Sequence, residues 1–232
     1  GIYMNTTVSG ARIPIRPDDV VLAVLPFFHV YGLTSVLNIC VRHACTMVLL
    51  PRFDAAAARA AVETFGRLDV WVNNAGVSLG FASILDESEQ QFAKTIEINL
   101  TGTWLGAKAA VRAMQQQEVS GRTRGHIVNV GSIAGSIGQA DLGGYSASKA
   151  AVHNLTRALA IELAPQQITV NAIAPGYFPT AMNRSLWDDA DELARGQSLH
   201  PLPLGVPDDV AAAVAFLGSA DASFVTGIVL PV

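Results

Sequence analysis

The run His126-Ile-Val-Asn-Val130, followed directly by Gly131-Ser132, is a short β-branched apolar segment that ends at a glycine and a small hydroxyl. Similar runs recur on both sides of it and alternate with Ala-rich stretches of helical period. This alternation is typical of βαβ units and of a parallel sheet that is buried on both faces. The sequence therefore predicts an α/β fold with a doubly wound, mostly parallel sheet and helices on both of its faces.

The same reading predicts the elements of this fold along the chain. Six strands are expected at residues 20–25, 46–50, 69–72, 126–130, 168–172 and 228–230. Helices are expected near residues 32–43, 54–65, 87–117, 144–163, 184–195 and 207–218. Two strands precede residue 69, and the predicted strand order is 2-1-3-4-5-6, with Val20 to Leu25 beside Asp69 to Val72. An alternative register places Thr46 to Leu50 in that position instead.

Composition restricts the class of protein. A chain of 232 residues, half of them apolar, has the size of one large α/β domain, and a single domain over 1–232 is expected. The net charge of -4 leaves no basic face for nucleic acid. Cys40 and Cys45 lack CxxC spacing and are expected to be buried thiols in a reducing compartment. The sequence shows neither a membrane-length apolar run nor a secretory signal, so a cytoplasmic protein without membrane contact is expected.

Tyr145 and Lys149 are the first candidate catalytic pair. They lie four residues apart at the start of a predicted helix, which places both side chains on one helical face. A phenol with a reference pKa of about 10 exchanges protons near neutrality only if its phenolate is favoured, and an adjacent ammonium favours it. Lys149 is therefore expected to lower the pKa of Tyr145.

Two further polar residues are expected near this pair. Ser132 follows a strand and should emerge at the carboxyl edge of the sheet, where α/β folds bind ligands. Its hydroxyl is expected to hold a substrate oxygen while Tyr145 passes the proton. Asn99 lies within an otherwise apolar helical run and is expected to anchor a water near Lys149.

From about residue 55 to residue 232 the chain resembles the short-chain dehydrogenase/reductase family. Asn73-Asn74-Ala75-Gly76, Ser132, Tyr145-x-x-x-Lys149 and Pro175-Gly176-Tyr177-Phe178-Pro179-Thr180 match the family's motifs in order. The resemblance implies a single Rossmann-like domain, NAD or NADP as cofactor, and the catalytic residues Asn99, Ser132, Tyr145 and Lys149. It also implies cofactor contacts from Asn74, Ala75, Gly76, Tyr145, Lys149, Pro175, Gly176, Phe178 and Thr180.

The first 55 residues depart from this family. A Gly-rich turn is expected after the first strand to approach the cofactor pyrophosphate, but Pro26-Phe27-Phe28-His29-Val30-Tyr31-Gly32 follows instead. Residues 19–32 and 44–54 resemble a segment of adenylate-forming acyl-CoA ligases, so the chain is interpreted as a chimera of a ligase-like graft (1–55) and a reductase-like body (55–232). His29 is either a core histidine or, as imidazolium, a partial replacement for the missing turn.

Two functions of different classes follow. The first is an NAD(P)-dependent oxidoreductase that interconverts a small alcohol and its ketone, of the 3-oxoacyl, sugar or steroid reductase class. The second is a folded, catalytically silent chimera or scaffold, because loss of the pyrophosphate contacts would weaken cofactor binding by about 3 to 5 kcal/mol. A third, a fragment of an acyl-CoA ligase, lacks that family's other motifs.

The sequence does not distinguish NAD from NADP, and it does not identify the substrate. Its five histidines lack metal-ligand spacing, and no metal is expected. The expected partners are a small-molecule substrate and a second copy of the chain, in a homodimer or homotetramer. Ala-rich faces of the helices at 99–117 and 145–163 resemble the family's dimer surfaces.

Overall fold

The computed structural model describes residues 20–23, 46–49, 62–63, 66–178, 188–198, 200 and 202–232. Within these residues lies a six-stranded sheet of β1 (Val20–Ala23), β2 (Thr46–Leu49), β3 (Val70–Asn73), β4 (Gly125–Val130), β5 (Ile168–Ala174) and β6 (Val229–Pro231). The strand order is β2-β1-β3-β4-β5-β6, and every neighbouring pair is parallel. Residues Val21 and Leu22 of β1 pair with Val70 and Trp71 of β3. The predicted order is confirmed, and the alternative register is not observed.

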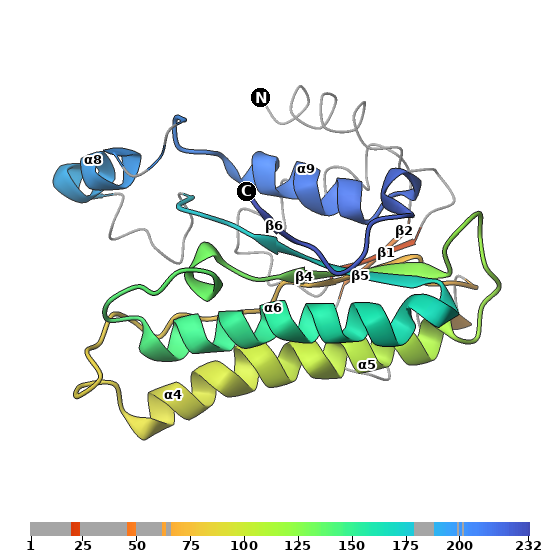
Figure 1. Ribbon diagram of the computed structural model, residues 1–232, viewed down its shortest axis with the longest axis horizontal. Helices are drawn as coiled ribbons and strands as arrows, with labels where there is room; N and C mark the ends of the chain where they lie inside the picture. The colour runs from red at the N-terminus through yellow and green to blue at the C-terminus, as the bar shows by residue number, and fades with distance from the viewer. Residues whose placement is uncertain are drawn as a thin grey trace.

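Helices cover both faces of the sheet (Figure 1). On one face lie α4 (Glu89–Ile96), the π-helical turn η2 (Glu97–Thr101), α5 (Gly102–Met114) and α6 (Gly143–Leu163). On the other face lies α9 (Pro207–Leu217), while α8 (Ala190–Ser198) projects away from the sheet. Three short 3₁₀ turns complete the described elements: η3 (Ile133–Gly135), η4 (Ala164–Gln166) and η6 (Ala220–Ala222). The helix predicted at 87–117 is one long rod interrupted by the π turn.

The helix α6, which carries Tyr145 and Lys149, has an unusual start. Helix α4 begins with a capping box, in which Ser88 and Gln91 bind each other's main-chain N–H groups. Leu142, at the start of α6, has no side chain able to do this. Instead, the Glu87 carboxylate accepts the N–H of Gly144 at 3.1 Å. Negative charge at a helix N-terminus is favourable, so the loop before α4 stabilises the start of α6.

The apolar core has two parts, one on each face of the sheet. Between the sheet and helices α5 and α6 lie Leu68, Trp71, Ala107, Ala109, Ala110, Met114, Ile127, Ala160, Leu163, Ile168 and Val170. Between the sheet and α9 lie Val128, Ile173, Phe178, Val210 and Leu217. Because successive strand residues face opposite sides, β4 contributes Ile127 to the first cluster and Val128 to the second. Burial on both faces explains why the strands are mostly apolar.

A chain of buried amides crosses the sheet under the site. The Trp71 indole N–H donates to Asn73 Oδ1 at 2.6 Å, and Asn73 Nδ2 donates to Asn129 Oδ1 at 2.8 Å. Asn129 Nδ2 then donates to Thr156 Oγ1 on α6 at 2.9 Å. Each buried amide has a partner, which removes most of the penalty for placing it in the core. These bonds join strands β3 and β4 to helix α6.

Several sequence predictions concern residues outside the described ranges. They are the helix at 32–43, most of the helix at 54–65, the first part of the helix at 184–195, His29 and the Pro26 to Gly32 segment. Of the ligase-like segment, strands β1 and β2 are described, and they form a parallel pair. The chimera and its division near residue 55 therefore stay predictions.

Candidate active site

The predicted site residues lie along one edge of the sheet. Strands β3, β4 and β5 are parallel and end at Asn73, Val130 and Ala174, so the segments that follow them leave the sheet on the same side. The main-chain N–H of Ile133 donates to the Pro175 carbonyl at 2.9 Å, which ties two of these segments together. The carboxyl edge predicted from the sequence as the ligand-binding edge thus carries the motif residues.

Lys149 is held beside Tyr145 by the last carbonyl of a strand. Its ammonium lies 5.7 Å from the centre of the Tyr145 ring and donates to the Val130 carbonyl at 2.9 Å. The lysine is only 4% exposed. A buried ammonium with few partners is costly, and the strand-end carbonyl partly compensates for that cost. The spacing of four residues on α6 therefore places both side chains at the site, as predicted.

Ser132 completes the group. It is extended (φ −169°, ψ 154°) directly after β4, and its hydroxyl accepts the Ala134 N–H at 3.2 Å at the start of η3. The same side chain is hydrogen-bonded to Tyr145. The structure therefore brings Ser132, Tyr145 and Lys149 together at one point of the sheet edge.

The acid-base properties of the pair differ from the expectation based on charge alone. Burial raises the pKa of Tyr145 above its ordinary value, and the hydrogen bond from Ser132 opposes this only in part. Burial also lowers the pKa of Lys149 to about 8. Desolvation disfavours the charged form of both groups, and for Tyr145 it outweighs the hydrogen bond from Ser132. At neutral pH, Tyr145 is a neutral proton donor and Lys149 is mostly charged.

Asn99 joins the cofactor-side turn to the catalytic helix. Its side chain is fully buried; Oδ1 accepts the Val77 N–H at 2.8 Å, and Nδ2 donates to the Val77 carbonyl at 3.0 Å. Nδ2 also donates to Ser148 Oγ at 3.0 Å, and Ser148 in turn donates to the Tyr145 carbonyl at 2.7 Å. These bonds hold the segment after Gly76 against α6 at the level of Tyr145.

Replacing Asn99 with Leu is expected to lower the free energy of unfolding by roughly 2 to 4 kcal/mol, because the half-buried Val77 N–H and carbonyl and the Ser148 hydroxyl lose their bonds to the buried amide. Urea denaturation measures the change. Glu97→Gln is the control, since Glu97 lies in the same π turn with its side chain 63% exposed and should shift stability by about 0.5 kcal/mol or less. Equal stabilities of the two variants would contradict the clamping role of Asn99.

Gly76 shows why the cofactor-side turn ends in glycine. A methyl group added to Gly76 would lie 3.2 Å from Lys149 Nζ and 3.4 Å from Asn99 Oδ1. Asn74 and Gly76 are half-buried and Ala75 is exposed, so the turn forms part of the accessible surface above the lysine. The absence of a side chain at Gly76 lets the turn lie close to the Lys149 ammonium.

The loop after β5 supports the site from the other side. Gly176 donates its N–H to the Val232 carbonyl at 3.0 Å, next to Pro175. The ring of Phe178, predicted from the resemblance to line the nicotinamide, lies in the core cluster with Val210 and Leu217. Thr180, the last predicted cofactor contact, lies outside the described residues. The packing of Phe178 indicates a supporting role under the loop.

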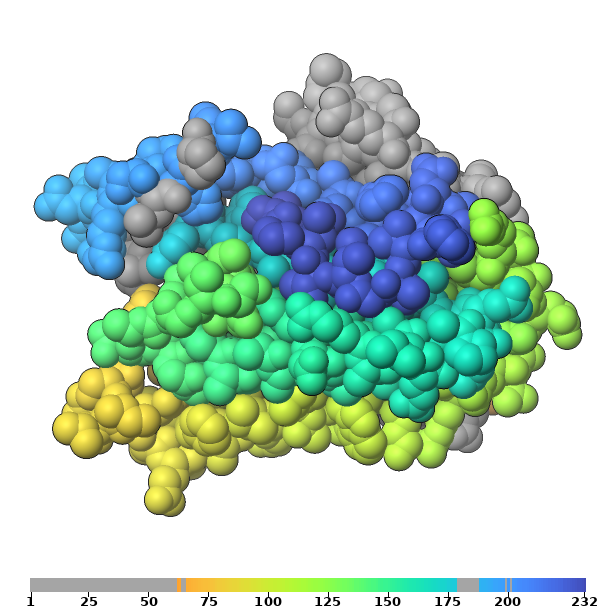
Figure 2. Space-filling model, viewed as in Figure 1, coloured from red at the N-terminus to blue at the C-terminus, as the bar shows by residue number. Residues whose placement is uncertain are grey.

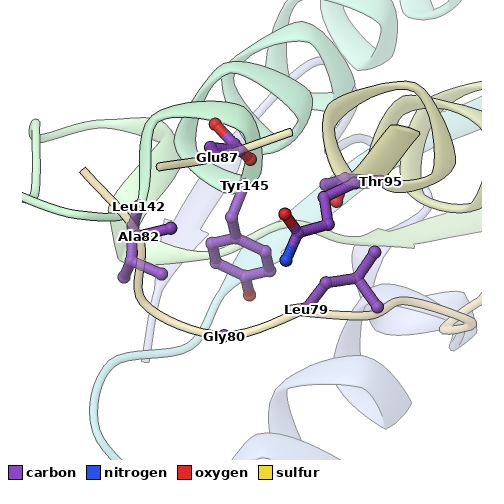
Figure 3. Close-up of a pocket in the computed structure, with 8 residues that line it drawn as sticks. Leu79, Gly80, Ala82, Glu87, Thr95, Leu142 and Tyr145 are labelled. Carbon is purple, nitrogen blue, oxygen red and sulfur yellow. The ribbon is translucent and has the colours of Figure 1, made fainter. Parts of the chain in front are cut away.

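A small pocket lies beside the Tyr145 ring (Figure 3). In this view Tyr145 extends from α6 between Leu142 and Thr95. Its lining contains both apolar and polar residues: Leu79, Gly80, Ala82, Glu87, Gln91, Thr95, Leu142 and Tyr145. The sequence analysis did not single out Glu87, Ser148 or Leu142 as parts of the site. Ser148 shares the start of α6 with Tyr145 and was detectable by that proximity, whereas Glu87 reaches α6 only through the fold.

The described ranges contain no group of three or more His, Cys, Asp or Glu residues placed to hold a metal ion. None of the helices described in the structure combines the length and the apolar character that crossing a membrane requires.

Comparison with known proteins places these features in a family. A protein family described as enoyl-(acyl carrier protein) reductase matches residues 52–232. Cis-4-hydroxycyclohexanecarboxylate dehydrogenase of Sinomonas cyclohexanicum is 45% identical over 183 residues, covering 77% of this chain and 70% of the relative. Dehydrogenase/reductase SDR family member 4 of Homo sapiens is 41% identical over 168 residues, which cover 72% of this chain and 59% of the human protein.

A solved structure agrees with the sequence relatives. The ligand-free aldohexose dehydrogenase of Thermoplasma acidophilum matches with a TM-score of 0.80 and 28% identity, over 94% of this chain and 92% of that one. The shared architecture includes the parallel sheet and the helices on both of its faces. The chain belongs to the short-chain dehydrogenase/reductase family.

Proposed function

We propose that this chain is an NAD(P)-dependent oxidoreductase that interconverts a small alcohol and its ketone, in the class that includes 3-oxoacyl, sugar and steroid reductases. The observation that carries the proposal is the group of Ser132, Tyr145 and Lys149 at the carboxyl edge of the sheet, directly beside the turn that ends at Gly76. The names of the relatives support it, since both are dehydrogenases by name.

The residues at the nicotinamide end of the site fit such a cofactor. The Lys149 ammonium, which lies next to the Gly76 turn, is a donor suited to the hydroxyls of a ribose. The residues proposed to hold the cofactor are Asn74, Ala75, Gly76, Tyr145, Lys149, Pro175, Gly176 and Thr180, whereas Phe178 packs in the core and supports the loop. The bound nicotinamide would supply or accept a hydride. The segment that would meet the pyrophosphate, after β1, lies outside the described residues.

In this proposal the side chains of the site have different roles toward the substrate oxygen. Ser132 orients the oxygen by hydrogen bonding, and Tyr145, whose pKa is raised by burial, donates the proton during reduction. The Lys149 ammonium stabilises the phenolate that this transfer leaves behind. Asn99 is proposed to hold a relay water near Lys149, because the hydrogen bond from Val77 leaves Oδ1 with a second lone pair.

Titration with NADH and NADPH, followed by fluorescence or calorimetry, tests the proposal. A dissociation constant below about 100 μM is expected for at least one of them if the oxidoreductase function is correct. Gly76→Val should abolish this binding because the added side chain would crowd the Lys149 ammonium. Gly102→Ala, whose added methyl would lie 3.8 Å from the Glu97 carbonyl, is the control that should bind normally. Absence of detectable binding by the wild-type chain would favour the silent chimera.

We also propose that the chain assembles as a homodimer or homotetramer through the α5 and α6 face. Figures 1 and 2 show the rod of α4 and α5 running beside α6 along one side of the molecule. This side exposes large apolar residues, namely Phe92, Trp104, Leu105 and Ile161. Apolar side chains grouped on helices of a soluble fold are typical of subunit contacts.

A further inference from the structure

His153 is a buried histidine that the proposed mechanism does not use. It lies one helical turn after Lys149 on α6 and is only 3% exposed. Its ring fills the space between two glycines on either side of Ser132. A methyl group added to Gly131 would overlap with the ring, and one added to Gly135 would lie 2.8 Å from Cε1. The loop that carries Ser132 is therefore closed around this ring.

The ring is hydrogen-bonded to the same loop. The main-chain N–H of Ser132 donates to His153 Nε2 at 3.4 Å. The other ring nitrogen, Nδ1, lies 3.4 Å from Ser136 Oγ, and the ring also bonds to the main chain of Gly135. Since Nε2 accepts a hydrogen bond, the proton of the neutral ring is assigned to Nδ1. His153 thus contacts the Ser132 loop on both sides of the catalytic hydroxyl.

We propose that His153 is a positioning residue that holds the Ser132 hydroxyl against Tyr145, and that it does so only as the neutral imidazole. The inference rests on the proposed oxidoreductase function, in which Ser132 orients the substrate oxygen. Protonation would place an N–H on Nε2 directly opposite the N–H of Ser132. Two donors facing each other repel, so the contact that holds the loop would be lost.

The surroundings of the ring favour its neutral form. Burial lowers the pKa of His153, and the charged groups that act on the ring, Arg157 and Lys149 on α6, lower it further. The end of β4 and the turn η3, which pack against the ring, present main-chain groups and the hydroxyls of Ser132 and Ser136. Because the groups that act on the ring include two cations, protonation requires a pH below the ordinary range of histidine.

The kinetic test compares three variants across pH. The proposal predicts that kcat of the wild-type chain falls at acid pH, when His153 becomes protonated. His153→Gln places an amide oxygen near the position of Nε2 and does not titrate, so its kcat should stay within about threefold of wild type and should not fall at acid pH. His153→Leu keeps the volume but loses the acceptor, so kcat should fall at least roughly tenfold at every pH. The control is His126→Gln, since His126 is a second buried histidine that contacts Thr123 and Thr169 and should leave the profile of kcat unchanged.

A second measurement does not depend on turnover. In ¹⁵N NMR spectra of the wild-type chain, the His153 ring should be the Nδ1–H tautomer, and the Ser132 amide should shift with the titration of that ring. The inference is overturned if kcat of the His153→Gln variant still falls at acid pH, or if the Ser132 amide signal does not shift when the His153 ring titrates. If the chain shows no turnover at all, the proposed function fails. The NMR titration of the Ser132 amide then tests the contact between His153 and Ser132 by itself.

Discussion

Replacing Tyr145 with Phe is expected to lower kcat by roughly 100- to 10,000-fold, which is the usual contribution of a general acid or base. The phenol is the group of the site that can pass a proton to the substrate oxygen, and burial keeps it protonated at neutral pH by raising its pKa. The ring and its packing are preserved in the variant, so cofactor affinity should stay nearly unchanged. Steady-state kinetics together with a cofactor titration measure both quantities.

Tyr177→Phe is the matched control for this substitution. Tyr177 is a half-buried tyrosine at the same sheet edge, and its hydroxyl lies 3.4 Å from Gln139 Nε2. Its loss should change kcat by less than about tenfold because Tyr177 is not bonded to Ser132. Comparable turnover of Tyr145→Phe and wild type would exclude Tyr145 as the acid.

Replacing Lys149 with Met is expected to abolish activity and, at the same time, to raise the free energy of unfolding at pH 7 by roughly 2 kcal/mol. Burial lowers the pKa of Lys149 from 10.5 to about 8, so the charged form is disfavoured in the folded chain by roughly 3 kcal/mol. The lost hydrogen bond to the Val130 carbonyl offsets about 1 kcal/mol of that gain.

The pH dependence identifies the cause of this gain. Between pH 8 and 10.5 the unfolded wild-type chain binds a proton that folded Lys149 has released, so wild-type stability rises with pH across this window. The Lys149→Met variant lacks this group, so the difference between its free energy of unfolding and that of wild type should shrink as the pH approaches 10. Urea denaturation at pH 7 and pH 10 measures the difference. Lys94→Met, at an exposed position, is the control and should show no such trend. If Lys149→Met and wild type differ in free energy of unfolding by the same amount at pH 7 and pH 10, burial of the charge is not the cause.

Much of the architecture could be predicted from local pattern. The strand around residues 126–130 and its partner at 168–172 are rich in β-branched residues, and both are observed within two residues of the predicted ends. Strand order followed from the number of strands before Asp69 and from the rules of right-handed crossovers. Asn129, a polar residue in the middle of β4, did not disturb the prediction because its amide bonds to Asn73 and Thr156.

The group of candidate catalytic residues was also predictable, since helical spacing and a strand-end position are local properties of Ser132, Tyr145 and Lys149. What local pattern could not supply is the environment of each side chain. The sequence predicts a lowered pKa for Tyr145, whereas the fold buries the phenol and raises it. Spacing places His153 on the same face as Lys149, but only the fold closes the Ser132 loop around its ring.

The sequence by itself determined the parallel sheet, its strand order and the identity of the residues that meet at its carboxyl edge, because periodicity and spacing act over a few neighbouring residues. The tertiary structure decided which of these side chains are desolvated, the packing of Phe178 in the core, and the support of α6 by Glu87. Burial and long-range hydrogen bonds depend on segments far apart in the chain, so they arise only when the whole sheet has assembled.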